Sequence, residues 1–297
     1  MRFSPTTGFG IPALAVGILV ISFSPVLVQV SEVGPSAIAL YRMLFAMPTL
    51  TAWVLAERRW EPTHKRHLTR RNLMLLALAG LFFAGDLIAW HNAIRLSGVA
   101  NATFLAHLST PIVSIGAWLI FRERLSWGFM TGLMIAMTGT ALIMGASTFG
   151  LSGHLLGDGL GVLTAFFYGA YLLVIKRLRD SLPSGLIMAV SSFFSLLIFL
   201  IAAVVMGETL VPETLIGWGF LVAIGIGIHS GGQGLITIAF RHINASFASV
   251  ALLATPVLAA FFGWLLLGET LTLPQSIGCA AVLAGIILSQ RFSRAKS

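Results

Sequence analysis

The sequence predicts an all-α membrane protein in which ten transmembrane helices form two inverted five-helix repeats. The first observation is compositional: hydrophobic residues make up 57% and charged residues 9% of the 297, and the mean hydropathy is +0.95. A soluble domain carries roughly 25% charged residues. The second observation is that apolar stretches long enough to span a bilayer occur ten times. The third is a motif that returns about half the chain later with its flanking charges lost.

The ten predicted spans follow from length and polarity. A bilayer core about 30 Å thick requires roughly 20 apolar residues at a rise of about 1.5 Å each. The first stretch contains Pro25 and leads into further spans, so we interpret it as a membrane helix and not as a cleavable signal. The longest polar connection runs from Glu57 to Arg71, which leaves no room for a separate soluble domain. The predicted spans are 10–30, 36–56, 72–94, 99–121, 127–146, 157–178, 184–206, 213–239, 245–267 and 273–290.

The repeated motif begins with Thr-Pro inside an apolar segment and continues through Trp and Glu to two glycines. The two copies are offset by 145 residues at Thr-Pro and by 146 at the glutamate. The first copy has Thr110-Pro111, Trp118, Glu123, Leu125-Ser126, Gly132 and Gly139, and the second has Thr255-Pro256, Trp264, Glu269, Leu271-Thr272, Gly278 and Gly285. The pattern predicts a duplication, with repeats at 1–148 and 149–297 that together form one integrated membrane domain.

The distribution of Lys and Arg predicts the orientation. With a cytoplasmic N-terminus, 16 of the 18 basic residues fall on the inner side, Arg95 falls outside and Arg42 lies within a span. Both termini are then cytoplasmic, and the net charge of +8 is a topology signal, so we expect no nucleic-acid partner. Five helices per repeat is an odd number, so the repeats must face opposite ways, as in an inverted pair around a binding site. The loop of Glu123 has two flanking arginines, which the loop of Glu269 has lost.

These features resemble the drug/metabolite transporter superfamily, specifically its EamA-type ten-helix exporters. Gly34-Pro35, Tyr41-Arg42 and both copies of the motif carry the resemblance, which covers nearly the whole chain. It implies a bacterial inner-membrane carrier that exports small organic metabolites by alternating access. The short joints and the 5+5 form are more similar to the bacterial aromatic and neutral amino-acid exporters than to the nucleotide-sugar carriers. The resemblance also implies a central cavity lined by the first, third, fourth, sixth, eighth and ninth spans.

Asp86 is the leading candidate for that cavity. It is the only carboxylate that we expect deep in a span, about 21 Å along the third predicted helix, and Trp90 follows four residues later on the same face. A carboxylate in hydrocarbon costs several kcal/mol unless it is paired or faces water, so it marks a functional site. The alternative is a hydrogen-bonded Asp86 that ties two helices together, or a position close enough to the outer interface to be wet.

Two histidines and a glycine-rich segment are further candidates. We expect His107, His229 and Gln233 to line the cavity, although a lone membrane histidine can also serve as a packing hydrogen bonder. Gly231 and Gly232 predict a hinge in the eighth span, because glycine loosens a helix; the alternative is close helix packing.

Aromatic and proline positions complete the predicted cavity. Tyr168 and Tyr171 share one face of the sixth span and predict an aromatic wall, with packing through satisfied hydroxyls as the alternative. Ser24 is the candidate in the first span, and Pro25 beside it predicts a hinge, because proline removes a backbone hydrogen bond.

Three other charged residues are interpreted as structural. Arg42 lies about 9 Å from the outer end of the second span and can snorkel to the headgroups. Its match to the family position implies a structural or gating role, so we do not expect it to contact the substrate. Glu123 and Glu269 precede the fifth and tenth spans and are expected to cap the starts of those helices.

The rival functions are a membrane-embedded enzyme and a channel. An enzyme requires clustered chemistry, whereas the histidines are scattered and Asp86 stands apart from other carboxylates, so we expect no catalytic residue, metal site or cofactor. The single cysteine, Cys279, excludes an internal disulfide. A channel would require a charged ring or a filter-like segment, and the sequence shows neither, so a channel is not expected. For a carrier two energetic schemes stay open: facilitated or exchange transport, which the lack of a second deep carboxylate favours, and proton-coupled multidrug or metabolite export through Asp86 or a histidine. A monomer is expected, since one chain supplies both repeats.

Overall fold

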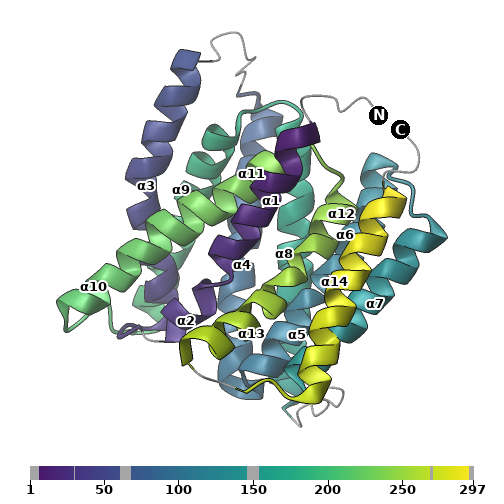
Figure 1. The fold of residues 1–297 in the computed structure, drawn as a ribbon. Helices are drawn as coiled ribbons and strands as arrows, with labels where there is room; N and C mark the ends of the chain where they lie inside the picture. The colour runs from purple at the N-terminus through teal and green to yellow at the C-terminus, as the bar shows by residue number, and fades with distance from the viewer. Residues whose placement is uncertain (1–6, 30, 61–67, 146–153, 268–269, 294–297) are drawn as a thin grey trace. The chain divides into compact units, whose positions relative to one another are not determined.

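The computed structural model describes residues 7–29, 31–60, 68–145, 154–267 and 270–293, and this part of the chain is helical without strands. Within it, nine helices are long and apolar enough to cross a membrane, and a tenth apolar helix, Phe9–Ile21, is shorter. The predicted fold class is therefore confirmed, and each predicted span coincides with one helix or with a broken helix. The elements are α1 (Thr7–Ile21), α2 (Ser24–Gln29), α3 (Pro35–Trp60), α4 (Arg70–Ser97), α5 (Val99–His107), α6 (Ser109–Phe121), α7 (Trp127–Met144), α8 (Leu155–Arg179), α9 (Ser184–Val205), α10 (Leu215–Val222), η2 (Ala223–Gln233), α11 (Gly234–Ala239), α12 (Ala245–Leu252), α13 (Ala254–Leu267) and α14 (Leu273–Ser293) (Figure 1).

The helices form two compact units that interleave along the chain. The first unit comprises residues 1–88 and 170–242, and the second comprises residues 89–169 and 243–297. Each unit therefore draws helices from both halves of the sequence, and α4 and α8 each contribute to both units. The division into repeats at residue 148 is a statement about sequence similarity and stays a prediction.

The repeated Thr-Pro motif marks a helix break in both halves. The fourth span is interrupted at Leu108, between α5 and α6, and the ninth at Leu253, between α12 and α13. A proline cannot donate to the carbonyl four residues earlier, which leaves the carbonyls of His107 and Leu252 without that bond. In the second copy the hydroxyl of Thr255 donates to the Leu252 carbonyl at 2.8 Å. The first span breaks in the same way, because α1 ends at Ile21, four residues before Pro25.

Within the second unit, α7 packs against α14 through paired glycines (Figure 1). A Cβ added to Gly132 would lie 2.7 Å from the Gly285 carbonyl oxygen, and one added to Gly139 would lie 2.6 Å from that of Gly278. The sequence repeat equates Gly132 with Gly278 and Gly139 with Gly285. The pair Gly132–Gly285 is therefore the equivalent of the pair Gly278–Gly139. A two-fold axis between two antiparallel helices produces this exchange. This pairing is the inverted repeat seen at the level of single residues.

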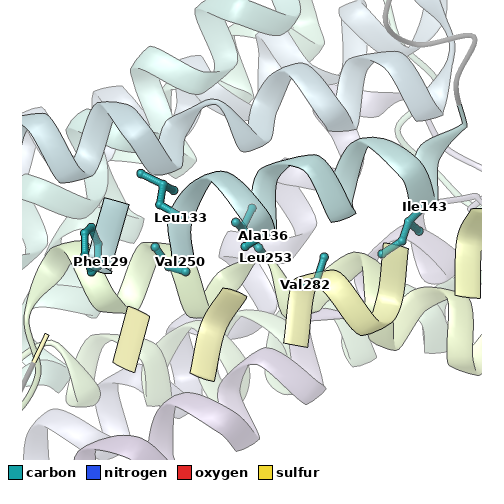
Figure 2. Packing of buried hydrophobic residues seen from close by; sticks show 7 residues of the cluster. All are labelled: Phe129, Leu133, Ala136, Ile143, Val250, Leu253 and Val282. Atoms are coloured by element: carbon teal, nitrogen blue, oxygen red, sulfur yellow. The ribbon is translucent and has the colours of Figure 1, made fainter. Parts of the chain in front are cut away.

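An apolar cluster fills the space beside this glycine pairing. Figure 2 shows side chains of α7 facing those of α12, α14 and the residue after α12. Phe129 is 2% exposed, and Leu253 and Val282 are fully buried. Between membrane helices such side chains stabilise the contact through van der Waals packing, because lipid is as apolar as the cluster itself. The full set in Figure 2 is Phe129, Leu133, Ala136, Ile143, Val250, Leu253 and Val282.

Within the first unit, α3 and α9 pack together and exchange carboxylate caps at both ends. Near the end of α3, both oxygens of Glu57 accept from the backbone N–H of Gly185, at 3.0 and 3.1 Å. Beyond the end of α9, Glu208 accepts from the N–H groups of Ser36 and Ala37 at 2.8 and 3.0 Å. The first N–H groups of a helix have no partner within it and favour negative charge, so each carboxylate stabilises the start of the other helix.

Glu123 forms an equivalent cap in the second unit, on a different helix from the one expected. Its carboxylate accepts from the N–H of Ala245 at 2.8 Å and from the N–H and hydroxyl of Ser246 at 3.1 and 2.6 Å, at the start of α12. The start of α7 is capped by Ser126, whose hydroxyl accepts from the N–H of Phe129 at 3.2 Å. Proximity in sequence suggested α7, but the αL conformation of Arg122 ends α6 and redirects the chain. Glu269 lies outside the described residues.

Candidate functional site

The first unit contains a cluster of buried polar side chains, which we call the polar cluster. Its members come from five elements, α3, α4, α8, α9 and η2. Burying charges and hydrogen-bonding groups at membrane depth is costly unless they meet one another or a ligand. The polar cluster consists of Arg42 (9% exposed), Asp86 (7%), Tyr171 (2%), Ser192 (2%), His229 (2%) and Gln233 (3%).

Phe83 organises the polar cluster. The Arg42 Cζ atom lies over its ring, 5.4 Å from the centroid. The rings of Tyr171 and His229 lie 5.0 and 5.4 Å from it, centroid to centroid. Asp86 follows three residues later on the same face of α4. Phe83 was not predicted as a site residue, because an apolar residue in an apolar span carries no chemical signal; its spacing from Asp86 was the available clue.

The Arg42 side chain is buried in the polar cluster and does not extend to the lipid headgroups, so the expectation of snorkelling was wrong. Its side chain is 9% exposed. Its guanidinium lies over the ring of Phe83, which the rings of Tyr171 and His229 also approach. Distance along the helix axis suggested that the headgroups were within reach, but Arg42 lies on the face of α3 that packs toward α4. A guanidinium on an aromatic face is attracted by the ring quadrupole, and this attraction is larger when the pair is shielded from water.

His229 and Gln233 are presented by a π-helix, η2, which replaces the middle of the eighth span. The wider turn of a π-helix is rare and is frequently found at functional sites. The Nε2 atom of His229 is 2.7 Å from the hydroxyl of Ser192. The side-chain amide of Gln233 donates to the hydroxyl of Tyr171 at 3.4 Å. The π-helix thus links α9 and α8 to the polar cluster.

The Nδ1 atom of His229 is buried and has no hydrogen-bond partner among the described residues. A buried polar atom left in this state costs about 1–3 kcal/mol. If the Ser192 hydroxyl donates to Nε2, Nδ1 carries the ring proton and is a donor available to a ligand. The site therefore combines a cation, an anion, a free ring nitrogen and two aromatic rings.

The predicted hinge residues differ from one another in packing. A Cβ on Gly232 would lie 2.7 Å from Ile21 Cγ2, and one on Gly17 would lie 2.9 Å from the Gly232 carbonyl oxygen, so Gly232 permits close packing of α1. A Cβ on Gly231 would meet only the Ile226 carbonyl oxygen, at 3.6 Å. The hinge at these two positions, and at Pro25, stays a prediction.

The other predicted cavity residues lie outside the polar cluster. Trp90, His107 and Tyr168 belong to the second unit. The Trp90 ring lies 5.3 Å from that of His91, centroid to centroid. The Nδ1 atom of His107 is 2.7 Å from the carbonyl oxygen of Thr103, one turn earlier in its own helix. Ser24 begins α2 in the first unit and is half-buried. Of the predicted set, the structure brings together Tyr171, His229 and Gln233, and the buried Asp86 lies three residues from Phe83 on the same face of α4.

A second buried carboxylate lies at the start of a predicted span, and the expectation that Asp86 is the only one deep in a span is not affected by it. Asp158, in the first turn of α8, is 3% exposed and accepts a hydrogen bond from the side-chain amide of Asn101, which is 7% exposed. The helix start favours its negative charge. Both residues lie in predicted spans, so their polarity was visible, but the sequence did not show that they meet. In the described part of the chain, no group of three or more His, Cys, Asp or Glu side chains could hold a metal ion.

Comparison with known proteins agrees with this architecture. A model of the EamA-like transporter family matches residues 8–145 and again residues 155–290. The pseudopaline exporter CntI of Pseudomonas aeruginosa is 27% identical over 231 residues, which cover 77% of this chain and 78% of the exporter. An uncharacterized transporter of Archaeoglobus fulgidus is 25% identical over 280 residues, covering 90% of this chain and 92% of its own. A solved crystal structure with 18% identity shares the fold, with a TM-score of 0.81 over 97% of this chain and 99% of that one.

Proposed function

The chain belongs to the EamA-like transporter family, and from this premise we propose that it exports small organic metabolites, most specifically amino acids, across the bacterial inner membrane by alternating access. The similarity to a named exporter supports the direction of transport. The family and these relatives are transporters, so the proposed activity moves a substrate without altering it.

The observation that carries the proposal is the polar cluster. Charged and hydrogen-bonding side chains at membrane depth mark substrate or ion pathways. Asp86, Tyr171, His229 and Gln233 are the proposed substrate contacts within the first unit, with Arg42 added from the structure. Aromatic surface beside a few polar groups is typical of sites for small organic molecules. Ser24, Trp90, His107 and Tyr168 stay predictions.

The proposed energetics is facilitated or exchange transport. Arg42 lies on the ring of Phe83, three residues before Asp86 on the same face of α4, and a guanidinium at this place can satisfy the buried carboxylate without a proton. The second candidate is proton-coupled export, which the burial of Asp86 favours. If Asp86 carries the proton, Asp86→Asn abolishes the dependence of transport on a pH gradient. Unchanged pH-driven transport in that variant would exclude this role.

Counterflow in proteoliposomes tests the proposed function. Purified protein is reconstituted into vesicles preloaded with one unlabelled amino acid, starting with phenylalanine, threonine and methionine, and uptake of the labelled form is followed with and without a proton gradient. Saturable exchange without a gradient is the expected result. Activity that requires the gradient would favour proton coupling, and the absence of exchange across the panel would remove the amino-acid assignment.

A further inference from the structure

We propose that Arg42 and Asp86 together recognise a zwitterion, with the guanidinium binding the carboxylate of the substrate and the Asp86 carboxylate binding its ammonium group. The inference rests on the proposed function and names the charges that the substrate must carry. It assigns Arg42 to substrate recognition, a role that depth in the membrane alone argued against.

The first argument is the placement of two opposite charges in one buried cluster. Arg42 on α3 is 9% exposed and Asp86 on α4 is 7% exposed. The Arg42 guanidinium lies over the ring of Phe83, 5.4 Å from its centroid, and Asp86 follows Phe83 by three residues on the same face of α4. In the absence of substrate the two charges compensate each other, which makes their burial tolerable. A substrate with one negative and one positive group can compensate both charges: its carboxylate pairs with Arg42 in place of Asp86, and its ammonium pairs with Asp86 in place of Arg42.

The second argument is charge balance in a medium that excludes water. A zwitterion adds no net charge, so the cluster and ligand together remain neutral. An amine without a carboxylate, or an acid without an amine, adds one uncompensated charge at membrane depth, where a single charge is expensive. The site therefore selects by the pair of charges and tolerates variation in the rest of the ligand.

The third argument is the state of the groups around Arg42. The guanidinium lies on the face of Phe83, 5.4 Å from the centroid, which holds its planar set of donors in a fixed orientation suited to a carboxylate. The ring of His229 lies 5.4 Å from the same Phe83 ring, centroid to centroid, and its Nδ1 atom is buried without a hydrogen-bond partner among the described residues. With Ser192 donating to Nε2, Nδ1 is a second donor for the same carboxylate.

The alternative to be excluded is a structural pair that ties α3 to α4 and never meets substrate. A structural pair is disrupted by removal of either charge, and removal of both charges relieves the imbalance. If the pair recognises substrate, each single variant and the double variant lose selectivity for the amino acid, even where the variant is folded. The double variant therefore separates the two roles.

The experiment measures competition in the counterflow assay with phenylalanine as labelled substrate, or with whichever amino acid of the panel is exchanged. The competitors are the unlabelled amino acid, the matching amine that lacks the carboxylate and the matching acid that lacks the amine. We expect the wild type to prefer the amino acid to either analogue by at least about 30-fold, the lower end expected for one unpaired buried charge.

Three variants and one control are compared. Arg42→Gln should lose the preference over the amine, and Asp86→Asn should lose the preference over the acid. The double variant Arg42→Gln/Asp86→Asn buries no unbalanced charge, so it should fold and show neither preference. Ser22→Ala is the control, because its buried hydroxyl donates to the Ile18 carbonyl of its own helix and it should keep both preferences. Size-exclusion profiles and melting temperatures report folding.

The outcomes separate the inference from the proposed function. A folded double variant that retains the 30-fold preference for the amino acid overturns the inference and leaves the transport function standing. Equal inhibition of the wild type by the amine, the acid and the amino acid overturns it as well. Absence of wild-type exchange with every amino acid overturns both the proposed function and the inference that rests on it.

Discussion

His242 follows α11 and lies among cationic side chains at the end of the first unit. Burial and the charges of Arg241, Arg179 and Lys176 lower the pKa of its imidazole below the usual 6.5. The connection is held in place by Lys176, whose ammonium group donates to the Phe240 carbonyl at 2.7 Å. Below about pH 6.5 the unfolded chain takes up a proton that the folded protein resists. Stability from this group is therefore present above pH 6.5 and is lost as the pH falls toward the folded pKa.

The first prediction follows at this scale: the melting temperature falls between pH 7.5 and pH 5.5, and His242→Gln makes the fall smaller. The measurement is thermal unfolding of the purified protein in detergent across this pH range. His154→Gln is the matched control, because His154 is an exposed histidine at the start of α8 and not part of this cationic group. An equal pH dependence in wild type and His242→Gln would contradict the prediction.

At the scale of residues, the polar groups within the spans could be identified from the sequence, but the helix face on which each side chain lies could not. Asp86, His229 and Gln233 stood out because they interrupt apolar spans, and all three are buried in the structure. Arg42 was misread because depth along a helix does not reveal which face a side chain occupies. Phe83 could not be recognised, since its role depends on the rings and the guanidinium that surround it.

At the scale of elements, the carboxylate caps tie helix starts to distant segments. Glu208→Ala removes the acceptor of the Ser36 and Ala37 N–H groups at the start of α3. Loss of a cap costs about 1–2 kcal/mol, so the second prediction is a melting temperature lowered by a few degrees. Glu213→Ala is the control, because it removes an exposed carboxylate from the same connection between α9 and α10. Equal melting temperatures for the two variants would show that the cap contributes nothing measurable.

The glycine pairing of α7 and α14 yields the third prediction. A Cβ at position 285 would lie 2.5 Å from the Gly132 carbonyl oxygen and 2.6 Å from the Ala136 backbone nitrogen. Gly285→Ala should therefore force the helices apart at a cost of about 1–3 kcal/mol and lower the melting temperature. In Gly159→Ala the new Cβ meets no atom within 4 Å, and the higher helix propensity of alanine should leave stability equal or raised. A Gly285→Ala protein as stable as Gly159→Ala would refute the close approach.

The elements themselves were largely readable from sequence because bilayer thickness sets helix length and proline breaks helices. Pro111 and Pro256 lie where the fourth and ninth spans are interrupted, at Leu108 and Leu253. The π-helix η2 was not predicted. The segment is rich in glycine, which signals loosened packing, but a change from α to π hydrogen bonding leaves no periodic trace in an apolar sequence. Its consequence, the presentation of His229 beside Ser192, emerges only from the structure.

At the scale of the whole molecule, the described basic residues of the first unit, apart from the buried Arg42, gather at one end. Glu57 meets Gly185 at this end, and Leu68 lines a groove with Glu57 and Pro183, which places the start of α4 there as well. At the other end, where Glu208 meets Ser36, the described part of this unit carries acidic residues and no Lys or Arg. The basic residues at the first end are Arg58, Arg59, Arg70, Arg71, Lys176, Arg177, Arg179 and Arg241.

This asymmetry leads to the fourth prediction, that the basic end is cytoplasmic. Lys and Arg are retained on the cytoplasmic side during insertion, so Arg177 should face the cytoplasm and Glu213, at the other end, should face outward. Both side chains are accessible: Arg177 is 48% exposed and Glu213 is exposed. In a Cys279→Ser background, a membrane-impermeant maleimide should label Glu213→Cys in intact cells and Arg177→Cys only after permeabilisation. The reverse pattern would invert the orientation while leaving the helix pairing intact, because the glycine contacts of α7 with α14 do not depend on which side is cytoplasmic. Labelling of both positions in intact cells would contradict the prediction, because it would place both ends of α9, which lies between them, on the outer side of the membrane.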